Sequence, residues 1–451
     1  MRKDYEGYKP TDIAWIPQIP EHWNWSFLSQ VASEQKIKKP KNKILPVMSL
    51  SYGQIIRKKN IDAGLVPVSY DTYQLISKGN IILRFTDLQN DHTSLRTGLV
   101  KEDGIITSAY TNIQPKINSV FLAYLLHSYD TMKVFYGMGG GVRQSIGFKD
   151  VRYLQIPVPP RKEQDQIVRF LDWKVSSINK LIAIRKRQNG SLEELKRSLI
   201  GHLIMGQFST SLREANVSWV QAIPSHWKEK VLIQYAEEQQ IKNKGMIEDN
   251  LLSLSYGKII NKDINTTDGL LPANFEGYQI VHTGNIVLRL TDLQNDRKSL
   301  RTGLVTQTGI ITSAYTCLKV RDGILPEYLQ LQLHVADLCK VFYGMGGGVR
   351  QSIGFKDIRG LLIAVPPIDE QRHILQRVHG VEEPINHVIQ KNKERISELE
   401  NLKTRLIADV VTGQMDIRNI AVPEYEYVED IADDGCEEES EAKEGLYGEE
   451  E

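Results

Sequence analysis

The chain has 451 residues, 41% of them hydrophobic and 25% charged, which is typical of a soluble globular protein and predicts two or three domains. No apolar run approaches the roughly 18–20 residues that span a bilayer, and the N-terminus lacks the apolar stretch of a signal peptide. Three widely separated cysteines, with no C-x-x-C spacing, argue against a zinc site and a disulfide framework. We therefore expect a cytoplasmic protein without a membrane segment.

The formal net charge of zero hides two oppositely charged parts. Residues 423–451 contain 14 Asp or Glu residues and one Lys, a net charge of −13, so the first 422 residues carry +13. A basic body with an acidic tail favours a polyanion such as nucleic acid as a partner, although the same charges also serve solubility. The segment 418–451 is predicted to be an acidic, disordered tail.

The chain contains a tandem repeat of a unit of about 205 residues. The string KVFYGMGGGVRQSIGFKD occurs unchanged at 133–150 and at 340–357, and residues 79–111 differ from 284–316 at 7 of 33 positions. Two copies do not make a solenoid, which needs at least three stacked units. Either a shared ligand or recent recombination between the copies would preserve whole strings of residues in this way.

The first 160 or so residues of each copy alternate short β-rich runs with Gly, Asn and Asp turns. One amphipathic helix, SVFLAYLLHSYDTMKVFY, interrupts these runs in the first copy. A Pro-Pro pair, at 159–160 and again at 366–367, then ends each part, because proline fixes φ and restricts the residue before it. This pattern predicts two compact α+β domains, at 1–160 and 209–367.

A long helix is predicted after each Pro-Pro pair, at 161–208 and 368–417. Apolar residues recur there mostly at steps of three or four, close to the a/d seam of a coiled coil. Because neither seam can stay exposed, we expect the two helices to pack antiparallel in a pseudo-twofold arrangement. The predicted seam residues are Ile167, Leu171, Ile178, Leu181, Leu192, Leu195, Leu199 and Leu203 in the first helix, and Ile374, Val378, Val381, Ile385, Val388, Ile396, Leu399, Leu402, Leu406 and Val410 in the second.

The sequence shows no arrangement of residues for covalent or metal catalysis. GMGGGVRQS lacks the Lys-Ser/Thr of a phosphate-binding P-loop, and the G-x-G-x-x-G, H-E-x-x-H and G-x-S-x-G motifs are absent. His22 and His226 each precede a tryptophan and are interpreted as buried packing residues. We therefore expect a chain with no catalytic residue and no metal site.

Arginine and amide side chains recur together in both copies and favour DNA binding. Arg pairs with guanine edges and Asn or Gln with adenine edges, each pair contributing ~1–3 kcal/mol of discrimination. The motifs LR-x-TDLQND and SLRTG, the Arg-Gln after the triple glycine, and the run RKKN supply such residues for base or phosphate contacts. The candidate DNA-binding residues are Arg57, Lys58, Arg84, Gln89, Asn90, Arg96, Arg143 and Gln144 in the first copy, and Arg289, Gln294, Asn295, Arg301, Arg350 and Gln351 in the second.

The order of these features resembles the specificity subunit of type I restriction–modification systems. The letters that carry the resemblance are IPEHW and IPSHW at the start of each copy, and GFKD…IPVPPRKEQDQI and GFKD…IAVPPIDEQRHI before each helix. The resemblance covers about residues 10–420. It implies that each globular part is a target recognition domain that binds one half of a bipartite site on double-stranded DNA, with the helices as a spacer.

The resemblance also implies partners. Two methyltransferase subunits would dock on the helices, and restriction subunits with motor and nuclease activity would join them for cleavage. S-adenosylmethionine and ATP would bind only to those partners, so no cofactor is expected on this chain. The helix residues proposed for partner binding are Ile178, Leu192, Leu199, Ile385, Leu399, Leu402 and Leu406.

The two recognition domains are nearly identical here, whereas members of the family usually carry two dissimilar ones. Equal domains predict equal half-sites on opposite strands, and thus an interrupted palindrome. Two other functions stay open: a coiled-coil scaffold that presents two protein-binding modules, and an orphan subunit that guides methylation only.

Overall fold

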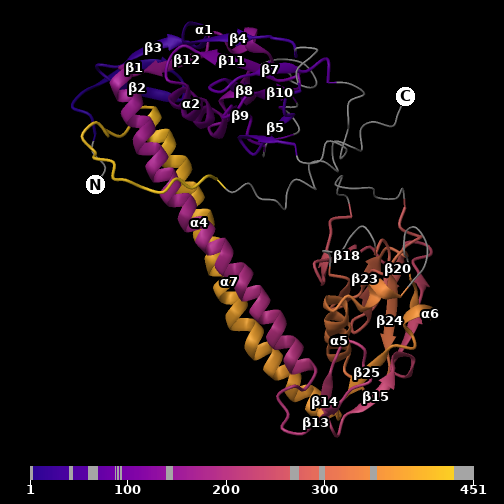
Figure 1. The fold of residues 1–451 in the computed structure, drawn as a ribbon. Coiled ribbons are helices and arrows are strands. Elements are labelled where there is room, and N and C mark those ends of the chain that lie inside the picture. Colours follow the sequence, from indigo (N-terminus) through magenta and orange to yellow (C-terminus); the bar gives the residue numbers. More distant parts are fainter. Residues whose placement is uncertain are drawn as a thin grey trace. The chain divides into compact units, whose positions relative to one another are not determined.

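The computed structural model describes residues 4–39, 44–58, 70–86, 88, 91, 94–138, 146–264, 274–293, 300–345 and 353–430. The chain divides into two compact units (Figure 1). Unit 1 comprises Met1–Arg187 and Asn392–Glu451, and unit 2 comprises Gln188–Lys391. Each unit therefore contains one globular part and a portion of both long helices. Both units mix helices and strands, which confirms this part of the predicted fold.

Unit 1 is organised around a four-stranded antiparallel sheet with the strand order β4-β11-β8-β9. Four two-stranded pairs surround it: β1 with β2, β3 with β12, β5 with β6, and β7 with β10. The strands are β1 Tyr8–Ile13, β2 Ile16–Pro20, β3 Asn24–Phe27, β4 Ala32–Gln35, β5 Met48–Ser51, β6 Gln54–Arg57, β7 Gln74–Ile76, β8 Ile81–Leu83, β9 Thr97–Leu99, β10 Gly104–Ile106, β11 Thr111–Pro115 and β12 Gln155–Val158.

Unit 2 repeats this plan, with a central antiparallel sheet of order β16-β24-β21-β22. The additional strand β17 extends the pair β20 and β23 to three strands. The strands are β13 Leu212–Glu214, β14 Ala222–Pro224, β15 Lys228–Val231, β16 Ala236–Gln239, β17 Ile241–Lys242, β18 Leu252–Ser255, β19 Lys258–Asn261, β20 Gln279–Val281, β21 Ile286–Leu288, β22 Thr302–Leu304, β23 Gly309–Ile311, β24 Thr316–Val320 and β25 Leu362–Val365.

One medium-length helix packs on the central sheet of each unit, as the amphipathic pattern predicts. Helix α2 begins after Asn118, whose side chain accepts hydrogen bonds from the backbone N–H groups of Val120 and Phe121 and so caps the helix. The helices are α1 Leu28–Val31, α2 Ser119–Thr131, η1 Val134–Gly137, α3 Phe148–Val151, α4 Arg161–Ile204, η2 Leu232–Gln234, α5 Pro326–Leu338, η3 Val341–Gly344, α6 Phe355–Ile358 and α7 Ile368–Val411.

The long helices α4 and α7 begin directly after the Pro-Pro pairs but end earlier than the predicted residues 208 and 417. A glycine in the left-handed region follows each helix, Gly206 at φ 64° and Gly413 at φ 75°. A Cβ on Gly413 would lie 2.4 Å from Pro20 Cδ, and a Cβ on Gly206 would lie 2.5 Å from Pro224 Cγ. Glycine therefore ends each helix where the chain turns closely past the IPxHW segment.

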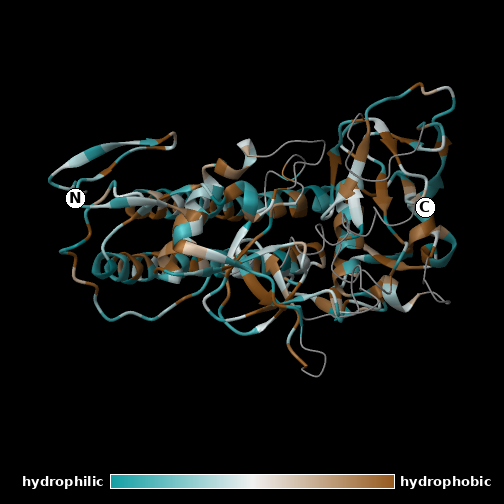
Figure 2. Cartoon of the chain, turned by 90° about the horizontal axis from the view of Figure 1, so that it is seen from above, coloured by the Kyte–Doolittle hydropathy of each residue, from teal (hydrophilic) through white to brown (hydrophobic). Residues whose placement is uncertain are grey.

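Each unit has a main core to which both long helices contribute. In unit 1, Phe170 of α4 and Val410 of α7 join Leu83 of β8 and Phe121 of α2 in one buried cluster. Unit 2 has the corresponding cluster, in which Leu203 of α4 and Val378 of α7 take part. Figure 2 shows hydrophobic strands within the globular parts. The helices are thus part of the core of each unit at their ends.

The prediction that the seam residues are buried is wrong for four of them. Leu181, Leu195, Val388 and Leu402 are 51%, 49%, 45% and 54% exposed. The buried or half-buried neighbours are Ile182, Lys196, Ile389 and Lys403, one position further along each helix.

Between Ile389 and Val410, α7 has a series of buried or half-buried residues spaced alternately three and four positions apart, with Ile407 buried in addition, and two residues of the series are polar. The residues of this series are Ile389, Asn392, Ile396, Leu399, Lys403, Leu406 and Val410. Asn392 accepts a hydrogen bond from Arg185 at 3.3 Å, and the Nζ of Lys403 lies 3.3 Å from the side-chain oxygen of Asn179. The apolar pattern accommodates Asn392 as the polar residue in its one wider gap, but it assigns exposed Leu402 and Val388 to the seam in place of Lys403 and Ile389.

Candidate nucleic-acid interface

One predicted DNA-binding arginine in each copy is wholly buried, so Arg96 and Arg301 do not contact DNA in this conformation. The guanidinium of Arg96 donates to the carbonyl oxygens of Thr86, at 2.7 Å, and Asp91, and its Nε donates to the hydroxyl of Tyr136 at 3.0 Å. Both arginines have 0% exposed surface. They bind the backbone of the loop that carries TDLQND and thereby position it.

The same arrangement recurs around Arg301 in unit 2. Its guanidinium donates to the carbonyl oxygens of Arg289, Thr291 and Asp292, and its Nε donates to Tyr343 at 3.0 Å. The physical reason for the wrong prediction is the number of donors: a guanidinium offers five N–H groups and can satisfy a whole turn of backbone carbonyls from inside. The sequence places these arginines correctly beside the loop but does not show that they point inward.

A buried carboxylate supports each of these arginines from the medium-length helix. Oδ2 of Asp130 accepts the backbone N–H of Arg96, and Oδ2 of Asp337 accepts the N–H of Arg301 at 2.8 Å. Burial raises the pKa of Asp130 to about 6, against the lowering effect of Arg96. The TDLQND loop is therefore held by a network that involves α2 or α5 and the central sheet.

The other predicted arginines of this region lie at the surface of that network. Arg84 and Arg289 are half-buried, and the guanidinium of Arg84 lies 3.9 Å from the carboxylate of Asp91. The remaining predicted loop residues lie outside the described residues; these are Gln89, Asn90, Arg143, Gln144, Gln294, Asn295, Arg350 and Gln351.

Arg57 is exposed at the end of the β5–β6 hairpin and forms an ion pair with Glu102, whose carboxylate lies 2.6 Å from its Nε. In unit 2 the equivalent residues, Asn261 and Gln307, form a hydrogen bond between their amide groups. An ion pair in one copy has become an amide pair in the other, so this position has a structural role. Lys58 is half-buried, and its backbone N–H donates to Val47.

The sequence reasoning missed an exposed tyrosine at the tip of the corresponding hairpin in each unit. Tyr52 and Tyr256 adopt φ values of 43° and 46°, a region that bulky residues rarely occupy. Tyr256 is 83% exposed. Strained residues of this kind cluster at functional sites. The repeated letters SYG, which end in a glycine at φ 78° in both copies, were the signal available in the sequence.

The motif letters IPxHW and EQ are joined by hydrogen bonds in both units. Glu163, three residues into α4, accepts from Trp23 Nε1 at 3.1 Å and lies 2.8 Å from His22 Nε2. In unit 2, Glu370 makes the same two contacts with Trp227, at 2.9 Å, and His226, at 2.7 Å. His22 and His226 are thus partly exposed partners of a carboxylate rather than buried packing residues. This clamp fixes the start of each long helix to the start of each globular part.

The predicted disorder of the tail is wrong for residues 418–430. Arg418 forms an ion pair with Asp416, and Ser176 of α4 hydrogen-bonds the backbone of Glu426 and Val428. The reason is composition: Val422, Tyr425 and Tyr427 interrupt the charges at this point of the sequence. Residues 431–451 lie outside the described part of the chain.

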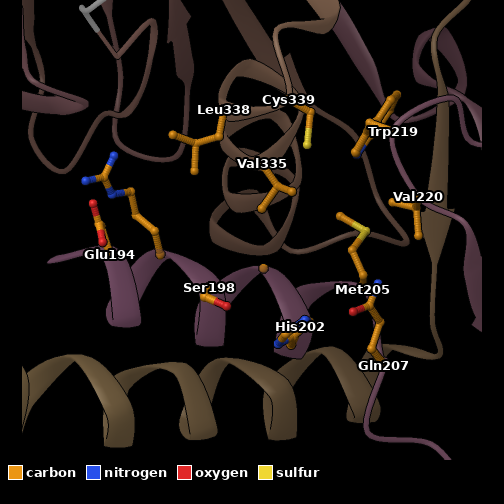
Figure 3. Close-up of a pocket in the computed structure, with 12 residues that line it drawn as sticks. Glu194, Ser198, His202, Met205, Gln207, Trp219, Val220, Val335, Leu338 and Cys339 are labelled. Carbon is orange, nitrogen blue, oxygen red and sulfur yellow. The ribbon is translucent and has the colours of Figure 1, made fainter. Parts of the chain in front are cut away.

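A surface pocket of about 480 Å³ lies in unit 2 between the last turns of α4 and helix α5 (Figure 3). Burial raises the pKa of the Cys339 thiol at its rim, which disfavours a nucleophilic thiolate. Among the described residues, no group of three or more His, Cys, Asp or Glu side chains is placed to hold a metal ion. None of the described helices is long and apolar enough to cross a membrane.

Comparisons with known proteins agree with these features. Residues 20–194 match the model of the type I restriction modification DNA specificity domain. A Methanocaldococcus jannaschii protein assigned as the MjaX type I restriction enzyme specificity subunit is 25% identical over 318 residues, covering 67% of this chain and 69% of that protein.

One solved structure supports the fold. A chain from a study of complex assembly and conformational transition of the type I R-M system matches with a TM-score of 0.59 and 16% identity, over 87% of this chain and 98% of that one. The HsdS subunit from Thermoanaerobacter tengcongensis, at 16% identity over 88% of this chain and 98% of its own, gives a TM-score of 0.42. The resemblance seen in the sequence is confirmed: residues 20–194 match the type I restriction modification DNA specificity domain, and the chain is similar to a specificity subunit of a type I restriction enzyme.

Proposed function

We propose that the chain binds double-stranded DNA sequence-specifically and directs type I methyltransferase and nuclease subunits to a bipartite, interrupted-palindromic site. The observation that carries this proposal is the duplicated loop support. Arg96 and Arg301 bind the backbone of the same TDLQND segment through equivalent carbonyl oxygens in both units. A segment that is anchored through the same threonine carbonyl in both units, and whose motif contains arginine and amide residues, is suited to contact the same base edges twice.

In this proposal, α4 and α7 form one antiparallel pair that spaces the two recognition domains. The hydrogen bond between Lys403 and Asn179 in unit 1 has an equivalent in unit 2, where Lys196 donates to Asn386 at 2.9 Å. In the repeat, Lys403 of α7 corresponds to Lys196 of α4, and Asn179 of α4 corresponds to Asn386 of α7. The same lysine–asparagine contact is therefore made twice, with the two helices in opposite roles. That is the pattern expected of a pseudo-twofold pair.

Partner subunits would dock on the outer faces of these helices. The exposed apolar residues there also come in equivalent pairs, Leu181 with Val388 and Leu195 with Leu402. Two equivalent apolar patches fit two copies of one partner, the methyltransferase subunit. S-adenosylmethionine and ATP would then bind to the methyltransferase and nuclease subunits, and this chain would need no cofactor of its own.

The DNA proposal is tested by fluorescence anisotropy with random-sequence duplexes at low and moderate salt, followed by selection of bound sequences. We expect binding that weakens steeply with salt, because phosphate contacts release counterions, and enrichment of a bipartite sequence. Absence of binding in the presence of the methyltransferase subunit would contradict the proposal and favour a protein-binding scaffold.

The docking proposal is tested by co-purification with the methyltransferase subunit. Leu195→Glu and Leu402→Glu together should abolish capture of that subunit while the free chain remains folded. A matched control, Ile184→Glu, changes an exposed apolar residue of α4 outside these pairs. Equal capture by the double variant and the wild type would show that the partner docks elsewhere.

A further inference from the structure

The acidic segment 423–430, called the latch segment below, crosses helix α4 in unit 1 (Figure 1) and contacts about one turn of it, at Ser176, Asn179 and Lys180. Its backbone is fixed by side chains of that helix. Ser176 Oγ donates to the carbonyl of Glu426 at 2.9 Å and accepts from the N–H of Val428 at 2.7 Å. Asn179 donates to the carbonyl of Val428 at 3.2 Å. These contacts place the segment in one register.

Three ion pairs link the latch segment to lysines of three different elements. Glu426 lies 3.1 Å from Lys180 of α4, and Asp430 lies 2.7 Å from Lys403 of α7. Glu429 lies 2.7 Å from Lys101, which belongs to the loop between β9 and β10. The segment therefore bridges the globular part of unit 1 and both of its long-helix portions.

A further contact reaches the hairpin that carries the exposed tyrosine. Gln54, two residues after Tyr52, donates to the carbonyl of Asp430 at 2.9 Å. The hairpin β5–β6 and the β9–β10 loop are the parts of the globular domain that the latch segment holds. Both lie beside the Arg57–Glu102 ion pair.

Unit 2 does not preserve this docking surface. The residues equivalent to Lys101, Ser176 and Lys180 are Thr306, Glu383 and His387. Two of the three cationic partners are thus missing or weakened, and a carboxylate replaces the serine that binds the backbone. The equivalent of Lys403, Lys196, forms an ion pair with Glu193 of its own helix at 2.7 Å.

We propose that this face of unit 1 is a docking surface dedicated to the chain's own C-terminal segment, which latches the first recognition domain to the helix pair and leaves the second domain unlatched. Two domains with nearly the same sequence thereby differ in how firmly they are held on the long helices. The first domain, which has these additional contacts to its helices, is the more preorganised of the two for binding.

The distribution of the lysines favours a latch over a competitor for DNA. If the lysines under the segment contacted phosphates, domains that bind equal half-sites would need them in both copies. Lys101 and Lys180 occur in one copy only, together with the segment that they bind. Their presence is explained by the segment and not by DNA.

The latch is tested by hydrogen exchange on the full chain and on two truncations. Ending the chain after residue 422 removes the latch segment, whereas ending it after residue 430 keeps the segment and removes most of the acidic charge. We expect about tenfold faster exchange or more in β5–β6 and the β9–β10 loop for the shorter chain only. The equivalent unit 2 peptides, β18–β19 and the β22–β23 loop, should be unchanged in both and serve as an internal control.

A second variant avoids truncation. Lys101→Gln with Lys180→Gln removes two of the three ion pairs in the full chain and should raise the hydrogen-exchange rate of the same peptides. The increase should exceed any change that added salt causes in the chain that ends after residue 422, because that chain has no latch ion pairs to screen. Unchanged exchange in both the shorter truncation and this double variant would overturn the latch. Equal changes in unit 1 and unit 2 would also overturn it.

The DNA arm of the test rests on the proposed function, and the exchange arm does not. Removing the latch segment should weaken binding of the specific duplex several-fold, because the first domain must then be ordered on binding, and should leave random-sequence binding unchanged when compared with the chain ending at 430. Tighter binding of both duplexes would instead identify the segment as a polyanion competitor. If no variant binds DNA while exchange behaves as expected, the proposed function fails and the latch stands.

Discussion

At the residue scale, one buried arginine in each unit holds the TDLQND segment, and its removal should affect folding before it affects the proposed DNA binding. Arg301→Ala leaves at least three backbone carbonyls without their donor. Loss of one partner from a buried charged network costs roughly 3–5 kcal/mol. We expect a decrease of this size in the free energy of unfolding of unit 2, measured by urea titration.

Arg57→Gln is the matched control for that experiment. It removes an exposed arginine from an ion pair at the surface, where changes stay within about 0.5 kcal/mol. A loss of DNA affinity in Arg301→Ala without any loss of stability would show that this arginine acts on DNA directly, as the sequence had suggested.

Two half-buried histidines, His127 and His334, give the molecule a defined dependence on acid. Burial lowers the pKa of His127 and His334 from 6.5 to about 4 in each case. The unfolded chain therefore binds protons below pH 6.5 that the folded chain rejects, so the contribution of these residues to stability is complete above that pH and is lost as the pH falls towards 4.

The prediction is a lower melting temperature at pH 5 than at pH 7.5, with a smaller difference in His334→Gln. Asp130 works in the opposite direction in unit 1, since burial raises its pKa to about 6 and favours the protonated form at low pH. The histidine effect should therefore be clearest in unit 2. Identical pH dependence of the wild type and His334→Gln would refute it.

At the scale of elements, the long helices show where sequence patterns succeed and fail. Their starts follow directly from the Pro-Pro pairs, because proline cannot continue a preceding hydrogen-bond ladder. Their inward faces do not, because Lys403 and Asn392 occupy seam positions through hydrogen bonds that no hydrophobicity pattern shows. The predicted exposure of Arg96 and Arg301 was wrong for the same reason, because burial of a charge depends on partners that are distant in sequence.

The two faces of α7 should respond oppositely to the same substitution. Ile407 is 4% exposed and Leu402 is 54% exposed. Ile407→Glu buries a charge without a partner and should lower the free energy of unfolding by more than about 3 kcal/mol, whereas Leu402→Glu should change it by less than about 0.5 kcal/mol. Urea unfolding of the two variants measures this directly. Equal decreases in the free energy of unfolding would show that Leu402 lies in the buried seam.

The clamp between IPxHW and EQ explains why the family resemblance is concentrated in a few letters. Glu163 and Glu370 each join a tryptophan N–H and a histidine to the first turn of a helix. In unit 1 the indole N–H of Trp23 and the carboxylate of Glu163 are buried together, so neither can change alone without leaving a polar group unsatisfied. The IPxHW and EQ motifs are recognisable in the sequence. The hydrogen bond that joins them across some 140 residues is visible only in the structure.

At the scale of the whole molecule, the duplication determines what kind of DNA site is expected. The central sheets of the two units have the same strand order, and residues 79–111 differ from 284–316 at 7 of 33 positions. In the proposed pseudo-twofold arrangement, equal domains bind equal half-sites in opposite senses, with centres on the order of one helical turn apart as in other twofold DNA-binding proteins.

The methylome of a strain that carries this chain and its methyltransferase subunit should therefore contain an interrupted palindrome with one methylated adenine in each half. Of the seven changes, His92 and Thr93 of the first copy correspond to Arg297 and Lys298 within the loop region. One altered contact shifts base preference by ~1–3 kcal/mol, so a single mismatch between the halves is compatible with equal domains. Two unrelated half-sequences would show that the preserved strings do not determine specificity, and recent recombination would then account for the repeat.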